Sequence, residues 1–289
     1  MSGDPFALDP QRVRAAFDAA AADYDAVAVV QAEVRQRLLE RLELFRIAPR
    51  RILDAGCGTG HGARALLGRY RRAALVALDQ APGMLLAARQ RRPWLRRLDP
   101  VCADAAALPL ADASVDLVFS NLMLQWCNEP DRVFAEFRRV LRPGGLLLFT
   151  TFGPDTLKEL RAAWRAADGA THVSRFIDMH DLGDALLRAG LAEPVMDAEH
   201  LTLTYPDVRT LMSDLKTMGA RNATAGRSRG LTGRRRLAAV EAHYETLRRD
   251  GRLPATWEVV YGHAWAGAPR SATPPGEATV PLASIRRGR

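Results

Sequence analysis

Short runs rich in apolar residues alternate with helix-like patterns along the first half of the chain. The helix-like patterns cover residues 63–70 and 130–141, and the second of them stops at a proline–glycine turn. Alternation of this kind with short connections predicts a doubly wound α/β sheet whose strands are covered on both faces. Such a sheet binds its ligand at the carboxyl ends of the strands. The predicted strands are one that ends at 52–54, followed by 74–78, 98–103, 115–120 and 146–151.

The pattern differs on either side of this core. A helical pattern covers residues 10–44, so we expect an N-terminal helical segment in residues 1–45 and one α/β domain in residues 46–265. Helical cap elements are expected within 155–252. Residues 266–289 are rich in proline and glycine and poor in apolar residues, which predicts a disordered tail. The later predicted elements are helices at 155–167, 179–189, 206–218 and 232–249, and strands at 194–205 and 257–265.

A glycine-rich turn follows the first predicted strand. It contains Gly56, Gly58 and Gly60 and leads into a helix, whose first N–H groups suit a carboxylate or a phosphate. The turn satisfies the dinucleotide pattern G-x-G-x-x-G/A only loosely. Asp54, at the strand end, would repel a pyrophosphate but would hold an ammonium group. The stretch therefore resembles motif I of the class I S-adenosylmethionine-dependent methyltransferases, and a turn without a ligand is the weaker alternative.

Two more carboxylates end predicted strands. Asp79 ends the second strand, where an acidic residue commonly holds a ribose diol. Asp104 ends the third, and with the neighbouring N–H of Ala105 it suits the adenine ring. Met84 is placed either against a purine face or in the core, and the sequence leaves both open. The predicted cofactor-binding residues are Asp54, Gly56, Gly58, Gly60, Asp79, Gln80, Met84, Asp104, Ala105 and Asn121.

The chain is basic, with a formal net charge of +8 over 289 residues. Residues 64–97 and 221–252 each contain nine arginines and few acidic residues, so an acidic partner is expected, either a protein or a nucleic acid. Solvated helix faces in an arginine-rich protein are the alternative. No aromatic side chains interleave with these arginines as stacking platforms would, which disfavours nucleic acid.

Cys57, Cys102 and Cys127 lie in unrelated contexts without a C-x-x-C pair, so the cysteines predict neither a metal site nor a disulfide framework. No apolar run is long enough to cross a membrane, and the first residues lack a signal-peptide pattern. We therefore expect a cytoplasmic protein.

Four later segments carry a more specific resemblance: Phe152–Leu160, Arg175–Asp184, Leu215–Asn222 and Glu258–Trp265. Together they resemble the biotin-pathway malonyl-[acyl-carrier-protein] O-methyltransferase family, and the likeness extends over residues 10–265. It implies a seven-stranded class I fold, S-adenosylmethionine as methyl donor, and a malonyl thioester on acyl carrier protein as acceptor. Ala81 and Ala106 depart from the family, which usually has serine and an acidic residue there.

Methylation of a malonyl carboxylate needs little side-chain chemistry, because the carboxylate is already ionised and the sulfonium methyl is already activated. Catalysis would consist of aligning the two groups in a site screened from water. The cations expected to orient the carboxylate come from the family-like segments: Arg175, Lys216, Arg221 and Arg227. Exposed surface charge is the alternative for each of them. Tyr24 is expected either to close over the cofactor or to pack in the core.

Three other functions stay open at this stage. The first is a methyltransferase acting on another small acceptor, such as a quinone ring or a free carboxylic acid. The second is an assembly factor or hydroxylase-like protein that binds S-adenosylmethionine, although the scattered histidines show no iron-binding pair. The third is a nucleic-acid binder that uses the basic regions.

Overall fold

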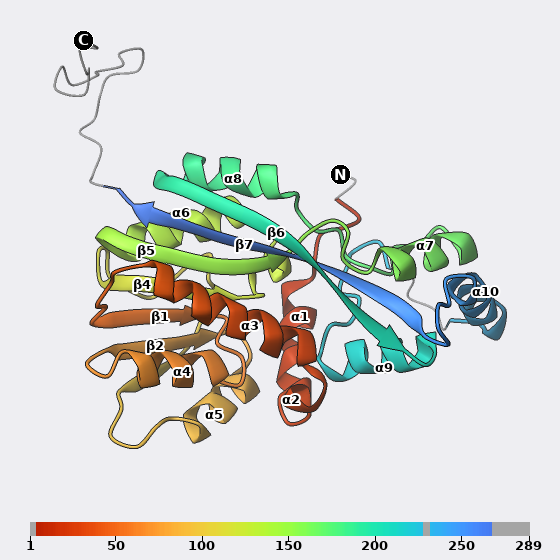
Figure 1. Ribbon diagram of the computed structural model, residues 1–289, viewed down its shortest axis with the longest axis horizontal. Coiled ribbons are helices and arrows are strands. Elements are labelled where there is room, and N and C mark those ends of the chain that lie inside the picture. Colours follow the sequence, from red (N-terminus) through yellow and green to blue (C-terminus); the bar gives the residue numbers. More distant parts are fainter. Residues whose placement is uncertain (1–3, 228–231, 268–289) are drawn as a thin grey trace, which may run out of the picture.

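The computed structural model describes residues 4–227 and 232–267, and the predicted tail lies almost entirely outside this range. A seven-stranded sheet with the order β3-β2-β1-β4-β5-β7-β6 forms its centre (Figure 1). Neighbours from β3 to β5 are parallel, whereas β7 is antiparallel to both β5 and β6. The strands are β1 (Arg51–Ala55), β2 (Ala74–Asp79), β3 (Leu98–Cys102), β4 (Val115–Asn121), β5 (Leu141–Phe152), β6 (Leu191–Tyr205) and β7 (Leu253–Ala266).

Helices cover both faces of this sheet, as the alternation predicted. Ile52 and Leu53 of β1 point to opposite sides, and each belongs to a different hydrophobic cluster. The first cluster includes residues of α3, α4 and α5, and the second includes residues of α6 and α8. The helices are α1 (Pro10–Ala20), α2 (Tyr24–Val27), α3 (Val29–Arg41), α4 (His61–Arg69), α5 (Pro82–Gln90), α6 (Pro130–Val140), α7 (Lys158–Ala167), α8 (Met179–Arg188), α9 (Val208–Thr217) and α10 (Arg234–Glu245).

The cap elements gather where β6 and β7 extend beyond the parallel strands. In Figure 1, α7, α9 and α10 lie around that end of the two long strands, and α7 packs against α10. A buried hydrogen-bonded tyrosine supports this packing, because Tyr244 of α10 donates its hydroxyl to Pro254 O at 2.8 Å. The cap is therefore continuous with the sheet rather than a separate body.

Several boundaries differ from the predictions. The continuous helical pattern of residues 10–44 is interrupted at 21–23 and at Ala28, which gives three helices and a short 3₁₀ turn (Leu42–Leu44). The helix predicted from Asp155 begins at Lys158, after Leu157 with φ +55°. β7 begins at Leu253, four residues before the predicted Trp257, because the strand continues past the sheet to pair with β6. Of the predicted tail, Ala266 is the last residue of β7.

Among the residues that the structure describes, no helix is long and apolar enough to cross a membrane.

Candidate active site

The glycine-rich turn lies at the carboxyl end of β1 and is bonded to β2. The backbone N–H groups of Gly56 and Cys57 both donate to Leu78 O, at 2.8 and 2.9 Å. Gly60 begins α4 with φ +87°, and a Cβ there would lie 2.7 Å from the Cα of Ala88. Helix α5 therefore packs so close to the turn that only glycine fits at this position.

Asp79 links the turn to the start of α5. Its Oδ2 accepts from the N–H of Gly58 at 3.0 Å, and its Oδ1 accepts from the N–H of Ala81 at 2.9 Å. Burial raises the pKa of Asp79, whereas these backbone donors act against that shift. The carboxylate is thus fixed at the edge of the sheet where the fold binds ligands.

Asp54 lies beneath the turn. Its side chain is buried, and its Oδ2 has no hydrogen-bond partner. Burial and the charge of Asp79 raise the pKa of Asp54 to about 7, against the opposing effects of Arg35 and the N–H of Ala63. Asp54 is therefore a buried, incompletely hydrogen-bonded carboxylate that does not line the cavity above it.

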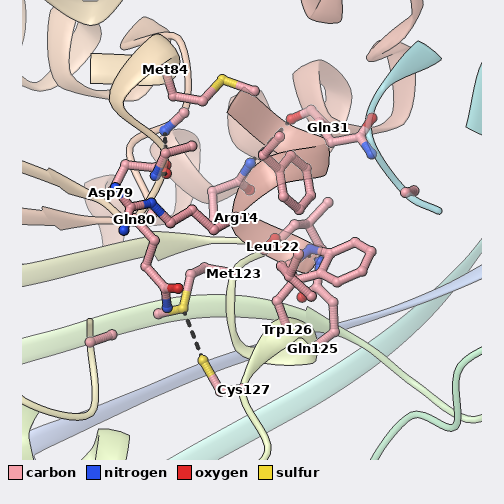
Figure 2. Close-up of a pocket in the computed structure, with 18 of the residues that line it drawn as sticks. Arg14, Gln31, Asp79, Gln80, Met84, Leu122, Met123, Gln125, Trp126 and Cys127 are labelled. Carbon is pink, nitrogen blue, oxygen red and sulfur yellow. Dashed lines mark hydrogen bonds between the residues drawn. The ribbon is translucent and has the colours of Figure 1, made fainter. Parts of the chain in front are cut away.

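A cavity opens above these groups at the carboxyl ends of the strands, where this type of sheet binds its ligands (Figure 2). Its floor comes from the ends of β1, β2 and β4 and from the loops after them, and α1, α2 and α3 close over it. The lining residues are Val13, Arg14, Phe17, Tyr24, Gln31, Gly56, Gly58, Leu78, Asp79, Gln80, Ala81, Met84, Ala103, Ala105, Asn121, Leu122, Met123, Gln125, Trp126, Cys127, Phe152, Met218, Ala220 and Trp257.

Most of the predicted cofactor residues lie in this wall: Gly56, Gly58, Asp79, Gln80, Met84, Ala105 and Asn121. Asp54 and Gly60 are not among the residues that line the cavity. Asp104 is exposed, and its Oδ1 accepts from the N–H of Ala106 at 2.9 Å. The ligand-binding roles of all ten residues stay predictions.

The predicted acceptor residues are more scattered. Tyr24 lines the cavity, and burial followed by the charge of Asp79 raises its pKa. Arg175 lines a neighbouring groove instead. Lys216 and Arg221 are exposed and lie outside both linings, and Arg227 donates to Thr224 O at 3.0 Å. Arg14 is the only Lys or Arg among the described residues that line the cavity.

Two polar side chains of the wall have buried atoms without a hydrogen-bond partner. They are Gln31, through Oε1, and Trp257, through Nε1. The amide of Gln31 donates only to a weak acceptor, the sulfur of Met218, at 3.4 Å. The sequence contains a signal for Gln31, because it is a polar residue beside Val30 and Val34 on the buried face of a helix. No such signal exists for Trp257.

An acidic residue fixes the N-terminal helices over the cavity. Asp25 of α2 accepts from the hydroxyl of Thr59 at 2.7 Å and forms an ion pair with Arg91, and its Oδ2 lies 3.3 Å from Nε2 of His61. These partners belong to the glycine-rich turn, α4 and the end of α5. Asp25 therefore connects the segment that carries Tyr24 to the floor of the site.

In the part of the chain that the structure describes, no group of three His, Cys, Asp or Glu side chains is arranged to hold a metal ion.

Comparison with known proteins identifies the class. Residues 53–149 match the family described as "Methyltransferase domain". The fold resembles the Bacillus subtilis YcgJ protein, with a TM-score of 0.59 and 16% identity over 81% of this chain and 99% of that one. It also resembles phosphoethanolamine N-methyltransferase 2 of Haemonchus contortus, solved with S-adenosyl-L-methionine, with a TM-score of 0.50 and 18% identity over 81% of this chain and 52% of that one. The fold is that of the class I methyltransferases, and the family match identifies its core as a methyltransferase domain.

Closer relatives define the family. A malonyl-[acyl-carrier protein] O-methyltransferase of Methylovorus sp. is 55% identical over 97% of both chains. Another, from Laribacter hongkongensis, is 58% identical over 92% of this chain and 93% of its own length. The chain belongs to the malonyl-[acyl-carrier protein] O-methyltransferase family. Because these alignments include the cap, the predicted resemblance and fold class are confirmed.

Proposed function

We propose that this protein transfers a methyl group from S-adenosylmethionine to the free carboxylate of a malonyl thioester carried by acyl carrier protein, as a cytoplasmic step in biotin formation. The observation that carries the proposal is the family membership, since relatives of this name align over the whole catalytic domain and the cap. The same alignments favour this acceptor over a quinone, a free carboxylic acid or an assembly-factor role.

The wall of the cavity fits the cofactor. Gly58 lines it, and a Cβ at Gly58 would meet no protein atom within 4 Å, so the turn leaves room for a ligand close to the backbone. We assign the ribose to Asp79 and the adenine to the surroundings of Ala105, with Met84 against the ring. When bound, the cofactor supplies a methyl group activated by a positive sulfur.

The residues of the site position the acceptor and do not move a proton. The malonyl carboxylate is an ionised nucleophile at neutral pH, so no general base is required. A cation paired tightly with it would stabilise the ground state more than the transition state, in which charge is being neutralised. We infer that neutral donors, chiefly the Trp257 indole and the Tyr24 hydroxyl, orient the carboxylate. Lys216, Arg221 and Arg227 would then act outside the cavity.

A direct assay tests the proposal. The purified protein is incubated with methyl-labelled S-adenosylmethionine and malonyl carrier protein, and the product is treated with mild base. We expect label on the carrier that base releases as methanol, because an ester is hydrolysed whereas an N-methyl group is not. Carrier protein with an acetyl thioester, which lacks the free carboxylate, is the matched control. Equal labelling of both carriers, or none of either, would contradict the proposed acceptor.

A further inference from the structure

A groove beside the cavity is lined by three arginines. Arg161 and Arg165 lie on α7, and Arg175 lies in the connection from α7 to α8. Within residues 4–227 and 232–267, none of the three forms an ion pair with a carboxylate. Of the acidic residues in the same groove, Glu129 forms an ion pair with Arg132, whereas Asp178 is hydrogen-bonded to His180 with Nδ1 2.7 Å from Oδ1. The groove also contains the carboxylates of Asp4 and Asp181.

Two backbone carbonyl groups hold Arg161 in place and leave its Nε donor unpaired. Its Nη1 donates to Pro154 O at 2.8 Å and its Nη2 to Thr156 O at 2.5 Å, whereas its buried Nε has no partner. Burial and the charge of Arg165 lower the pKa of Arg161, although a guanidinium stays protonated and nearby carboxylates offset part of the shift. A half-buried cation next to a like charge is stabilised by an anion, and charge-assisted hydrogen bonds to it are strong.

The groove leads into the candidate active site. Gln125 and Cys127 line both spaces. Phe176 of the groove packs edge-on against Phe152 of the cavity, with ring centroids 5.8 Å apart. A flexible chain lying in the groove can therefore place one end at the arginines and its other end in the cavity.

The walls suit a chain that is partly apolar and partly amide-like. Leu8, Val173 and Ile177 supply apolar surface, while Ser174 and Gln125 supply hydrogen-bonding groups. We propose that this groove binds the phosphopantetheine arm of the carrier protein, with its phosphodiester at the three arginines and its malonyl thioester passing into the cavity. This inference rests on the proposed function and assigns the arm of that acceptor to a place on the protein.

Two acceptors that differ only in the phosphate test the groove. Methyl transfer is measured to the malonyl thioesters of pantetheine 4′-phosphate and of pantetheine. We expect the wild-type protein to prefer the phosphorylated acceptor by about tenfold in kcat/KM, since one charge-assisted hydrogen bond is worth that much. In the double variant Arg165→Gln and Arg175→Gln, the ratio of the two kcat/KM values should fall towards one. We expect this change to come from a higher KM for the phosphorylated acceptor, with kcat unchanged. Arg64→Gln, an exposed arginine on α4, should leave it unchanged.

The outcomes separate this inference from the proposed function. A preference that survives in the double variant, or an equal loss on both acceptors, would refute the groove as a phosphate site. If the wild-type protein methylates neither acceptor, the proposed function fails, and the groove is judged by calorimetric titration with pantetheine 4′-phosphate. Binding that is at least about tenfold weaker in the double variant would support the groove; absence of binding to the wild type would refute it.

Discussion

Gly58 offers a way to separate cofactor binding from folding. It has φ +52° and lines the cavity, and a Cβ there would meet no protein atom within 4 Å. Gly144 has φ +77° and equally open surroundings but lies in the irregular first part of β5, outside the cavity. Replacing either glycine by alanine therefore imposes a similar backbone cost, whereas only Gly58→Ala adds a methyl group where the ligand is expected.

The magnitudes follow from the geometry. An alanine with left-handed backbone angles costs about 1–2 kcal/mol of stability. Replacing glycine also lowers the entropy of the unfolded chain, which offsets part of this cost. We therefore expect both variants to lose about 1 kcal/mol of stability, or roughly 2–4 °C in Tm. The extra methyl group of Gly58→Ala should cost a further 1–3 kcal/mol of binding by overpacking, which is a Kd for S-adenosylmethionine about five- to 150-fold weaker.

Thermal unfolding with and without S-adenosylmethionine measures both effects, and calorimetry gives the Kd directly. At a ligand concentration of about 100 times the wild-type Kd, bound cofactor adds about 2.7 kcal/mol to wild type and to Gly144→Ala. A hundredfold weaker variant would gain only about 0.4 kcal/mol. Unchanged affinity in Gly58→Ala would show that the glycine-rich turn does not hold the cofactor.

Other predictions concern the carboxylates of the site. Asp79→Asn should leave the N–H of Gly58 or Ala81 without an acceptor, costing about 1–3 kcal/mol of stability and at least about tenfold in S-adenosylmethionine affinity by calorimetry. Asp25→Asn should weaken cofactor binding by roughly fivefold with little loss of Tm, because the ion pair with Arg91 is partly exposed. The control is Asp23→Asn, since Asp23 is an exposed neighbour whose side chain forms no cap hydrogen bond. Equal effects of the two substitutions on cofactor binding would refute the role of Asp25. Because the pKa of Asp54 is raised to about 7, the folded state holds a proton that the unfolded state releases near pH 4, so stability should fall as pH rises from about 4 to 7. Urea unfolding of Asp54→Asn across that range should give a flatter profile, and identical profiles would disprove the raised pKa.

The local parts of the site follow from sequence. A buried strand, a glycine-rich turn and strand-terminal carboxylates placed Gly56, Gly58 and Asp79 at one edge of the sheet, where the structure has them. Strand periodicity assigns a side chain to a face but gives no distance to a cavity. For this reason it could not separate Asp79, in the wall, from Asp54, beneath it.

Long-range packing determines the features of the site that the sequence does not predict. Residues 20–28 contain no glycine or proline that would predict the breaks between α1, α2 and α3, and those breaks accompany the contacts of Asp25 with Thr59 and Arg91. Trp257 reaches the cavity because β7 inserts between β5 and β6, a pairing that no local pattern specifies. The same limit applies to Lys216 and Arg221, which lie outside the cavity, because their place in a family-like segment does not establish where their side chains point. Their roles stay predictions.

The position of β7 bears on how the protein is synthesised. β6 leaves the ribosome before β7, yet it can attach to the sheet only through β7. At about 5–20 residues per second, several seconds pass in which the outer edge of β5 has no pairing strand. Nascent chains of this protein would therefore expose an aggregation-prone edge late in translation, which makes them substrates for chaperones that protect unpaired strands.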